Sequence, residues 1–148
     1  MADLVSPHGG SALEPLMLEG EALFAERARA TSLRNVTVSS REKGDIIMLG
    51  IGGFSPLGGF MRHADWEGVC RDYRTAAGIF WPIPITLSVD AAAAEAIRIG
   101  DSITLVDHDD AEPLATMRVA EKYAIDKAFE CESVFRTTRF WRSLRQLC

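Results

Sequence analysis

Three histidines and a run of aspartates are the side chains of this sequence that could hold a metal ion. The histidines are His8, His63 and His108, and none belongs to an H-x-x-H or H-E-x-x-H pair. Asp107, Asp109 and Asp110 could suggest a cation-binding loop, but the run lacks the twelve-residue pattern of an EF-hand. A solvated turn explains it more simply, so we expect no metal site.

Two segments dense in glycine, proline and aromatic residues are the most distinctive part of the sequence. The first reads GFSPLGGFM at residues 53–61, and the second reads WPIPITL at residues 81–87. The adjacent Gly58 and Gly59 could present backbone N–H groups to an anion. The segment nevertheless lacks the lysine of a phosphate-binding loop and the glycine spacing of a dinucleotide-binding turn. We interpret the first segment as a rigid turn that buries Phe54, Phe60 and Met61. We interpret the second as a strand entry stiffened by its prolines, with Trp81 packed inside the fold. The alternative for Trp81 is an aromatic platform for a base.

The sequence contains no recognisable covalent catalyst, because no serine lies in a G-x-S-x-G motif or beside an evident base. A modest basic cluster could attract sulfate or nucleotide phosphates: Arg27, Arg29, Arg34, Arg41 and Lys43. Ion pairing on helix surfaces is the commoner explanation for such a cluster. We therefore assign no catalytic, cofactor-binding or metal-binding residue.

Length and charge restrict the function further. The chain has 148 residues, which fits one domain. Its net charge of −5 hides an asymmetry, since residues 1–135 carry −9 and residues 136–148 carry four arginines and no acidic residue. An acidic body disfavours nucleic-acid binding, where Lys and Arg supply most of the affinity.

The cysteines indicate the compartment. They are odd in number and widely spaced, which favours a reducing cytoplasm: Cys70, Cys131 and Cys148. No membrane span or secretory signal is visible.

Hydrophobic periodicity and capping signals predict helices and strands along most of the chain. Residues 1–15 are interpreted as an extended arm. We expect helices at residues 16–30, after the capping box that starts at Ser39, and at 64–77, 91–97 and 126–135. Strands are expected at 33–38, 102–106 and 114–120, the last two as an antiparallel hairpin, with 81–89 extended. The elements do not alternate as in a doubly wound sheet, which favours an α+β fold around a small, partly closed antiparallel sheet.

Several segments resemble, in order and spacing, the N-terminal region of the ATP sulfurylase (sulfate adenylyltransferase) family. They are PHGG at 7–10, VSSREKGD at 38–45, the two distinctive segments above, GD at 100–101, EPLA at 112–115 and VFRTT at 134–138. The resemblance covers about residues 4–138. It implies that residues 1–138 form a PUA-like domain, a small antiparallel β-barrel with added helices.

The resemblance also implies a function. The family's enzyme joins ATP and sulfate into adenosine 5′-phosphosulfate and releases pyrophosphate, in sulfate assimilation or sulfur oxidation. Its catalytic motifs, such as Q-x-R-N-P, lie in a later domain and do not occur in this sequence. The resemblance therefore implies a non-catalytic domain that is inactive alone and has no cofactor, whereas ATP with Mg²⁺ belongs to the complete enzyme. The implied partners are the catalytic domain and other subunits of a homo-oligomer, without membrane or nucleic acid.

The last ten residues, RFWRSLRQLC at 139–148, are unlike the family. We interpret them as a tail that follows the domain where the catalytic domain is missing. Such a tail could form a short basic amphipathic helix that touches a membrane surface or nucleic acid. It supports the alternative function, a free-standing PUA-like RNA-binding module. A residual enzyme with weak nucleotide affinity is a third hypothesis.

Overall fold

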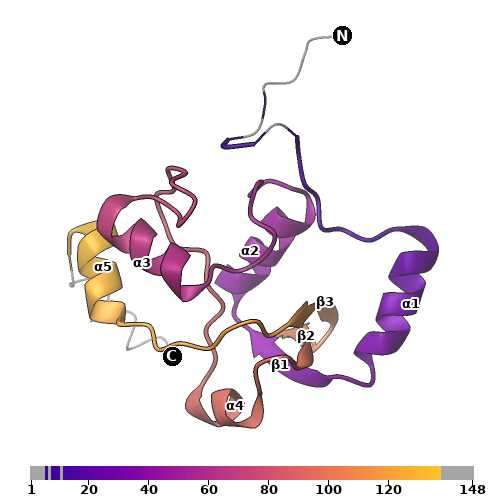
Figure 1. Ribbon diagram of the computed structural model, residues 1–148. Helices are drawn as coiled ribbons and strands as arrows, with labels where there is room; N and C mark the ends of the chain where they lie inside the picture. Colours follow the sequence, from indigo (N-terminus) through magenta and orange to yellow (C-terminus); the bar gives the residue numbers. More distant parts are fainter. Residues whose placement is uncertain (1–5, 7, 11, 138–148) are drawn as a thin grey trace. The chain divides into compact units, whose positions relative to one another are not determined.

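The computed structural model describes residues 6, 8–10 and 12–137 (Figure 1). Residues 139–148, which the sequence sets apart as a tail, lie outside the described residues. The helices are α1 (Gly20–Ala30), α2 (Ser40–Gly50), α3 (His63–Asp72), α4 (Ala91–Ala96) and α5 (Lys127–Phe135). The strands are β1 (Arg34–Val38), β2 (Ser102–Asp107) and β3 (Pro113–Arg118). In this part of the chain, no helix combines the length and apolarity that crossing a membrane requires.

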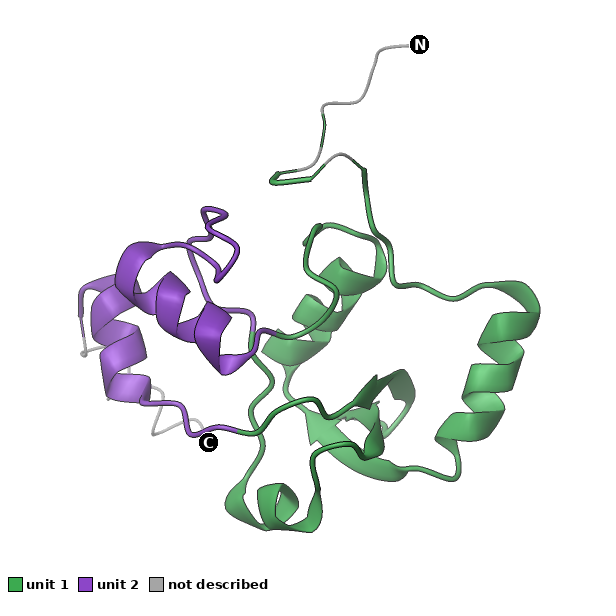
Figure 2. Cartoon of the chain, in the orientation of Figure 1, with its two compact units in different colours: residues 1–60, 86–122 green, residues 61–85, 123–148 purple. Residues whose placement is uncertain are grey.

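The chain divides into two compact units, each made of two separate stretches of sequence (Figure 2). Unit 1 consists of Met1–Phe60 and Thr86–Lys122 and contains the sheet with α1, α2 and α4. Unit 2 consists of Met61–Ile85 and Tyr123–Cys148 and contains α3 and α5. The predicted α+β class is confirmed.

The sheet of unit 1 has three strands in the order β1-β2-β3. β2 and β3 form the predicted antiparallel hairpin, with Leu105 opposite Ala115. β1 instead runs parallel to β2, so the sheet is mixed and the expectation of an antiparallel sheet is wrong for β1. The reason is the connection: a long crossover that includes α2, α3 and α4 returns the chain beside β1 in the same direction.

The core of unit 1 lies on this sheet. It is built from aliphatic side chains that are nearly inaccessible to solvent: Val36, Val38, Ile97, Ile103, Leu105 and Val119. Burial alternates along the end of β1, whereas it is continuous over residues 103–107 of β2, because the middle strand is covered more completely than an edge strand. Phe60 and Leu87 pack against the same core. They lie where unit 1 is interrupted in the sequence, on either side of residues 61–85, which belong to unit 2.

Two helix boundaries differ from the prediction by more than one residue. α1 begins at Gly20 rather than residue 16, because the backbone N–H groups of Leu16 and Met17 donate to the carbonyls of Leu49 and Gly50 at the end of α2. α3 ends at Asp72 rather than residue 77. There Tyr73 adopts a left-handed conformation, with φ of 53°, and its N–H closes the last turn on Val69.

Candidate functional site: a polar clamp at the start of helix α2

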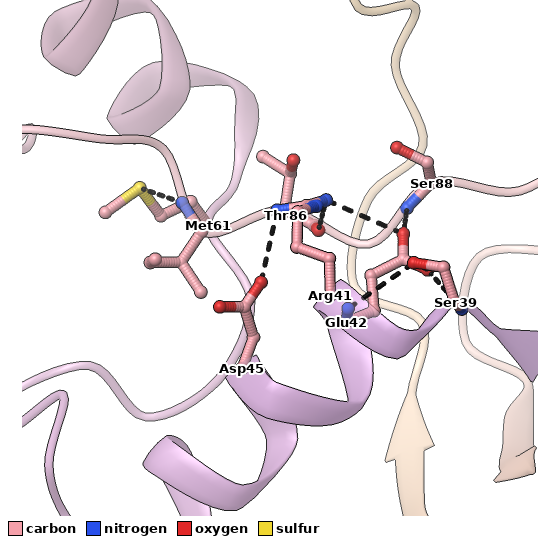
Figure 3. A network of polar contacts seen from close by, with 8 residues as sticks. Ser39, Arg41, Glu42, Asp45, Met61, Thr86 and Ser88 are labelled. Atoms are coloured by element: carbon pink, nitrogen blue, oxygen red, sulfur yellow. Dashed lines mark hydrogen bonds and ion pairs between the residues drawn. The ribbon is translucent and has the colours of Figure 1, made fainter. Parts of the chain in front are cut away.

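The carboxylate of Glu42 is an almost fully enclosed charged group within one of the segments that carry the family resemblance. The residue is only 4% exposed. One carboxylate oxygen accepts hydrogen bonds from the backbone N–H and the hydroxyl of Ser39, at 2.9 and 2.8 Å. The other accepts from the backbone N–H of Ser88 at 2.7 Å (Figure 3). The capping box predicted at Ser39 is confirmed, and its glutamate also binds a distant segment.

Arg41, the neighbour of Glu42 in the sequence, holds the same distant segment. Its guanidinium donates to the backbone carbonyl of Thr86 at 3.2 Å and to the carboxylate of Asp45 at 3.1 Å (Figure 3). Burial raises the pKa of Asp45, and the positive charge of Arg41 opposes that shift. We call the set Ser39, Arg41, Glu42, Thr86 and Ser88 the polar clamp. It fixes residues 86–88 against the first turn of α2.

The chemistry of the polar clamp is that of a structural site. Each carboxylate oxygen of Glu42 already accepts a hydrogen bond from the protein itself. Arg41 donates to a carbonyl and a carboxylate of the protein itself, although its side chain is 55% exposed. The clamp therefore fixes the end of the WPIPITL segment, where the chain returns to unit 1. It offers no arrangement for proton transfer or nucleophilic attack.

The start of the GFSPLGGFM segment forms a turn that is hydrogen-bonded internally, to the preceding residue Gly52 and to the N-terminal arm. The hydroxyl of Ser55 donates to the carbonyl of Gly52 at 2.6 Å and accepts from the backbone N–H of Glu14 at 2.8 Å. Within the same turn, the N–H of Leu57 donates to the carbonyl of Phe54. These contacts agree with the interpretation of the segment as a rigid turn.

The large side chains of the two distinctive segments are buried unequally. Trp81 is 8% exposed and Met61 is also buried, as predicted. Phe54 and Phe60 are half-buried, so the expectation of burial holds only in part for them. Phe60 lies against the edge of the unit 1 core rather than within it.

His63 and His108, two of the histidines singled out in the sequence, have different surroundings. His63 contacts the rings of Trp66 and Tyr123, with ring centroids 5.6 and 5.2 Å away. His108 lies on the surface beside Asp109. Among the residues that the structure describes, no three His, Cys, Asp or Glu side chains form a group that could hold a metal ion.

Four of the five members of the basic cluster form ion pairs, and pairing along a helix surface is confirmed for two of them, Arg29 with Glu26 and Arg41 with Asp45. The pairs are Arg27–Glu112, Arg29–Glu26, Arg41–Asp45 and Lys43–Asp107. Hydrogen bonds from Arg29 and Thr116 lower the pKa of Glu26 to about 2. The hydrogen bond from Lys43 lowers the pKa of Asp107 and raises that of Lys43. These cations are thus already neutralised by carboxylates.

Sequence reasoning missed a second set of contacts, which joins α3 to α5 within unit 2. The indole N–H of Trp66 donates to the carboxylate of Glu130 at 2.5 Å. The hydroxyl of Tyr73 donates to the carbonyl of Ser133 at 3.0 Å. The partners are 64 and 60 residues apart in the sequence, so no local spacing could have revealed them.

A small sheet with added helices, whose polar groups are bound within the fold, is the architecture of a known class of domain. The PUA-like domain family matches residues 5–140, and the chain belongs to that family. Over 138 residues it is 56% identical to a sulfate adenylyltransferase from Thiobacillus denitrificans, covering 93% of this chain and 34% of that protein. Over 136 residues it is 57% identical to the sulfate adenylyltransferase of Chlorobium chlorochromatii, covering 91% of this chain and 34% of that protein. The resemblance seen in the sequence is confirmed.

A solved structure shares the fold. It is described as a hexameric APS kinase from Thiobacillus denitrificans, and it matches with a TM-score of 0.72 and 31% identity. The match covers 84% of this chain and 24% of that chain. The chain thus spans about a third of the length of the curated relatives and a quarter of this structural relative.

Proposed function

We propose that this chain acts as the non-catalytic PUA-like domain of a sulfate adenylyltransferase and positions the catalytic region of that enzyme. The observation that carries the proposal is the 56% identity over 93% of the chain to one third of a sulfate adenylyltransferase. In the proposed complete enzyme, ATP with Mg²⁺ and sulfate react in the other two thirds to give adenosine 5′-phosphosulfate and pyrophosphate.

The polar clamp and the ion pairs of the basic cluster support a structural role. Adenylyl transfer to sulfate requires cations and hydrogen-bond donors directed at developing negative charge. In this chain, Arg41 and Lys43 are directed at Asp45 and Asp107. The body of residues 1–135 also carries a net charge of −9, which repels sulfate and nucleotide phosphates.

The remaining parts of the proposal concern architecture and partners. The three-stranded sheet belongs to a small β-barrel, as the family match suggests. The complete enzyme is a homo-oligomer, in line with the hexameric structural relative. It works in the cytoplasm, where the free thiols of Cys70 and Cys131 remain reduced. The RNA-binding alternative has less support, because the acidic body pairs its own basic residues.

A domain exchange tests the positioning role. Residues 1–138 of this chain replace the matching third of the Thiobacillus denitrificans sulfate adenylyltransferase, and pyrophosphate release is measured with ATP, Mg²⁺ and sulfate. We expect the exchanged enzyme to keep activity, whereas an enzyme without the matching third should lose it. A folded exchanged enzyme without sulfate-dependent turnover would contradict the proposal.

The same assay tests whether the isolated chain is catalytic. We expect the purified 148-residue chain to release no pyrophosphate above the blank without enzyme. Sulfate-dependent turnover that persists after further purification, and that co-elutes with the chain, would show that it has a catalytic site of its own.

A further inference from the structure

α3 and α5, the helices of unit 2, each end on a left-handed residue that is not glycine (Figure 2). Tyr73 follows α3 with φ of 53°, and Arg136 follows α5 with φ of 55°. This conformation is unfavourable for a residue with a Cβ atom, which is why glycine is usual at such a helix end. A residue of another type stays left-handed only where the surrounding contacts hold it, and such residues gather at functional positions.

These two left-handed residues are in contact with each other. The guanidinium carbon of Arg136 lies 5.9 Å from the centre of the Tyr73 ring, which is within the range of a cation–π interaction. The hydroxyl of Tyr73 donates to the carbonyl of Ser133, in the last turn of α5, at 3.0 Å. The carbonyl of Tyr73 accepts from the backbone N–H of Trp81 at 2.8 Å. Tyr73 is thus held at its backbone and at its hydroxyl, and its ring faces the arginine that ends α5.

Arg136 lies close to the end of the part of the chain that matches the relatives. The match to the PUA-like family stops at residue 140. In the proposed complete enzyme the catalytic region follows this domain, so the chain leaves α5 toward that region through residue 136. A left-handed residue at this point turns the backbone away from the helix axis, whereas a right-handed one would continue the helix. The backbone of Arg136 therefore sets the direction of exit.

We propose that Tyr73 and Arg136 are positioning residues, whose contact holds the left-handed turn at residue 136 and thereby fixes how the catalytic region is attached. The inference rests on the proposed function, because it requires a catalytic region after this domain. Neither residue acts on the reacting groups. Their contribution is geometric, since a displacement of about 1 Å that arises far from the reacting atoms can lower the rate about a hundredfold.

A second contact between an arginine and an aromatic ring provides a matched control. The guanidinium carbon of Arg71, on α3, lies 5.5 Å from the ring centre of Phe129, on α5. This contact joins the same two helices but does not involve the residue through which the chain leaves α5. Arg71→Gln therefore removes a comparable interaction without acting on the turn at residue 136.

Kinetics of the exchanged enzyme, which carries residues 1–138 of this chain, test the positioning role. Arg136→Gln should lower kcat by about tenfold or more and leave the KM for ATP nearly unchanged, because the turn is released but the ATP-binding residues are not altered. Arg136→Lys keeps the cation and should restore most of kcat. Arg71→Gln should leave kcat unchanged. Melting temperatures of the three variants separate this effect from a loss of folding.

Two kinetic outcomes have different meanings. An inactive exchanged enzyme without further substitutions contradicts the proposed function itself. An active exchanged enzyme whose kcat is unaffected by Arg136→Gln, or affected equally by Arg71→Gln, overturns only the positioning role of Arg136.

NMR of the 148-residue chain tests the turn without any assay of activity. The coupling constant between the amide and Hα protons of Arg136 depends on φ and reports its left-handed conformation. Tyr73→Asn removes the ring but keeps a residue that tolerates the left-handed end of α3. We expect this variant to shift the coupling constant of Arg136, and Arg71→Gln to leave it unchanged. A coupling constant that Tyr73→Asn does not shift would show that Tyr73 does not hold the turn, and would overturn the inference.

Discussion

The carboxylate of Glu42 and the backbone N–H of Ser88 lie 46 residues apart in the sequence and are joined by a hydrogen bond of 2.7 Å. Glu42 belongs to the first turn of α2, whereas Ser88 follows the WPIPITL segment. One side chain therefore completes a helix cap and also fixes a segment without regular structure. The contact explains why a glutamate that is almost fully enclosed can remain in the fold: its oxygens are hydrogen-bonded to donors.

The first prediction concerns this carboxylate. Glu42→Ala should lower the free energy of unfolding by about 1–3 kcal/mol, because the enclosed N–H of Ser88 is left without its acceptor. Urea denaturation measures the change. Glu95→Ala, at an exposed position of α4, is the control and should have little effect. Equal stability of the Glu42 and Glu95 variants would mean that the clamp does not contribute to folding.

The second prediction concerns the contact between α3 and α5. Trp66→Phe keeps an aromatic ring but removes the indole N–H that binds Glu130. We expect a loss of about 1.5–3 kcal/mol, the usual contribution of a hydrogen bond to a charged group. A double-mutant cycle with Glu130→Gln isolates the contact. Strictly additive effects of the two substitutions would argue against it.

The third prediction compares two aromatic side chains of the distinctive segments. Trp81→Ala should cost about 3–5 kcal/mol, since the side chain is buried. Phe60→Ala should cost less, because that side chain is half-buried at the edge of the core. The melting temperatures of the two variants show which substitution costs more stability. A larger loss for Phe60→Ala would show that burial does not determine their contributions.

The fourth prediction concerns stability at acid pH. The pKa of Glu26 falls from 4.5 to about 2 on folding, so its stabilising contribution is complete above about pH 4.5. That contribution is lost as the pH falls toward about 2, where the folded state also takes up the proton. Glu26→Gln should therefore lose less stability than the wild type over this interval. Urea titrations at several pH values test it, with the exposed Glu95→Gln as control.

The fifth prediction concerns the thiol of Cys70. Burial raises its pKa to about 12, which keeps the thiol protonated and unreactive at neutral pH. In the native chain, iodoacetamide should label Cys70 far more slowly than it does in urea, as peptide mass mapping can measure. Rapid labelling of Cys70 under native conditions would show that α3 opens readily.

The sequence alone determined the local elements and the family. The capping residues Ser39, Asp90 and Asp126 each accept backbone hydrogen bonds at the start of a predicted helix, because an N-cap depends only on residues within one turn. The hairpin of β2 and β3 was also predictable, since its strands are close neighbours in the sequence. The order and spacing of the glycine- and proline-rich segments indicated the family that the comparisons confirmed.

Only the tertiary structure decided the contacts between distant segments. The parallel pairing of β1 with β2, the bond from Ser88 to Glu42 and the bond from Trp66 to Glu130 all join residues far apart in the sequence. Such contacts depend on how the whole chain closes its loops, which no local pattern encodes. The hydrogen bonds from the arm to α2 likewise shortened α1, because tertiary contacts outweighed local helix propensity.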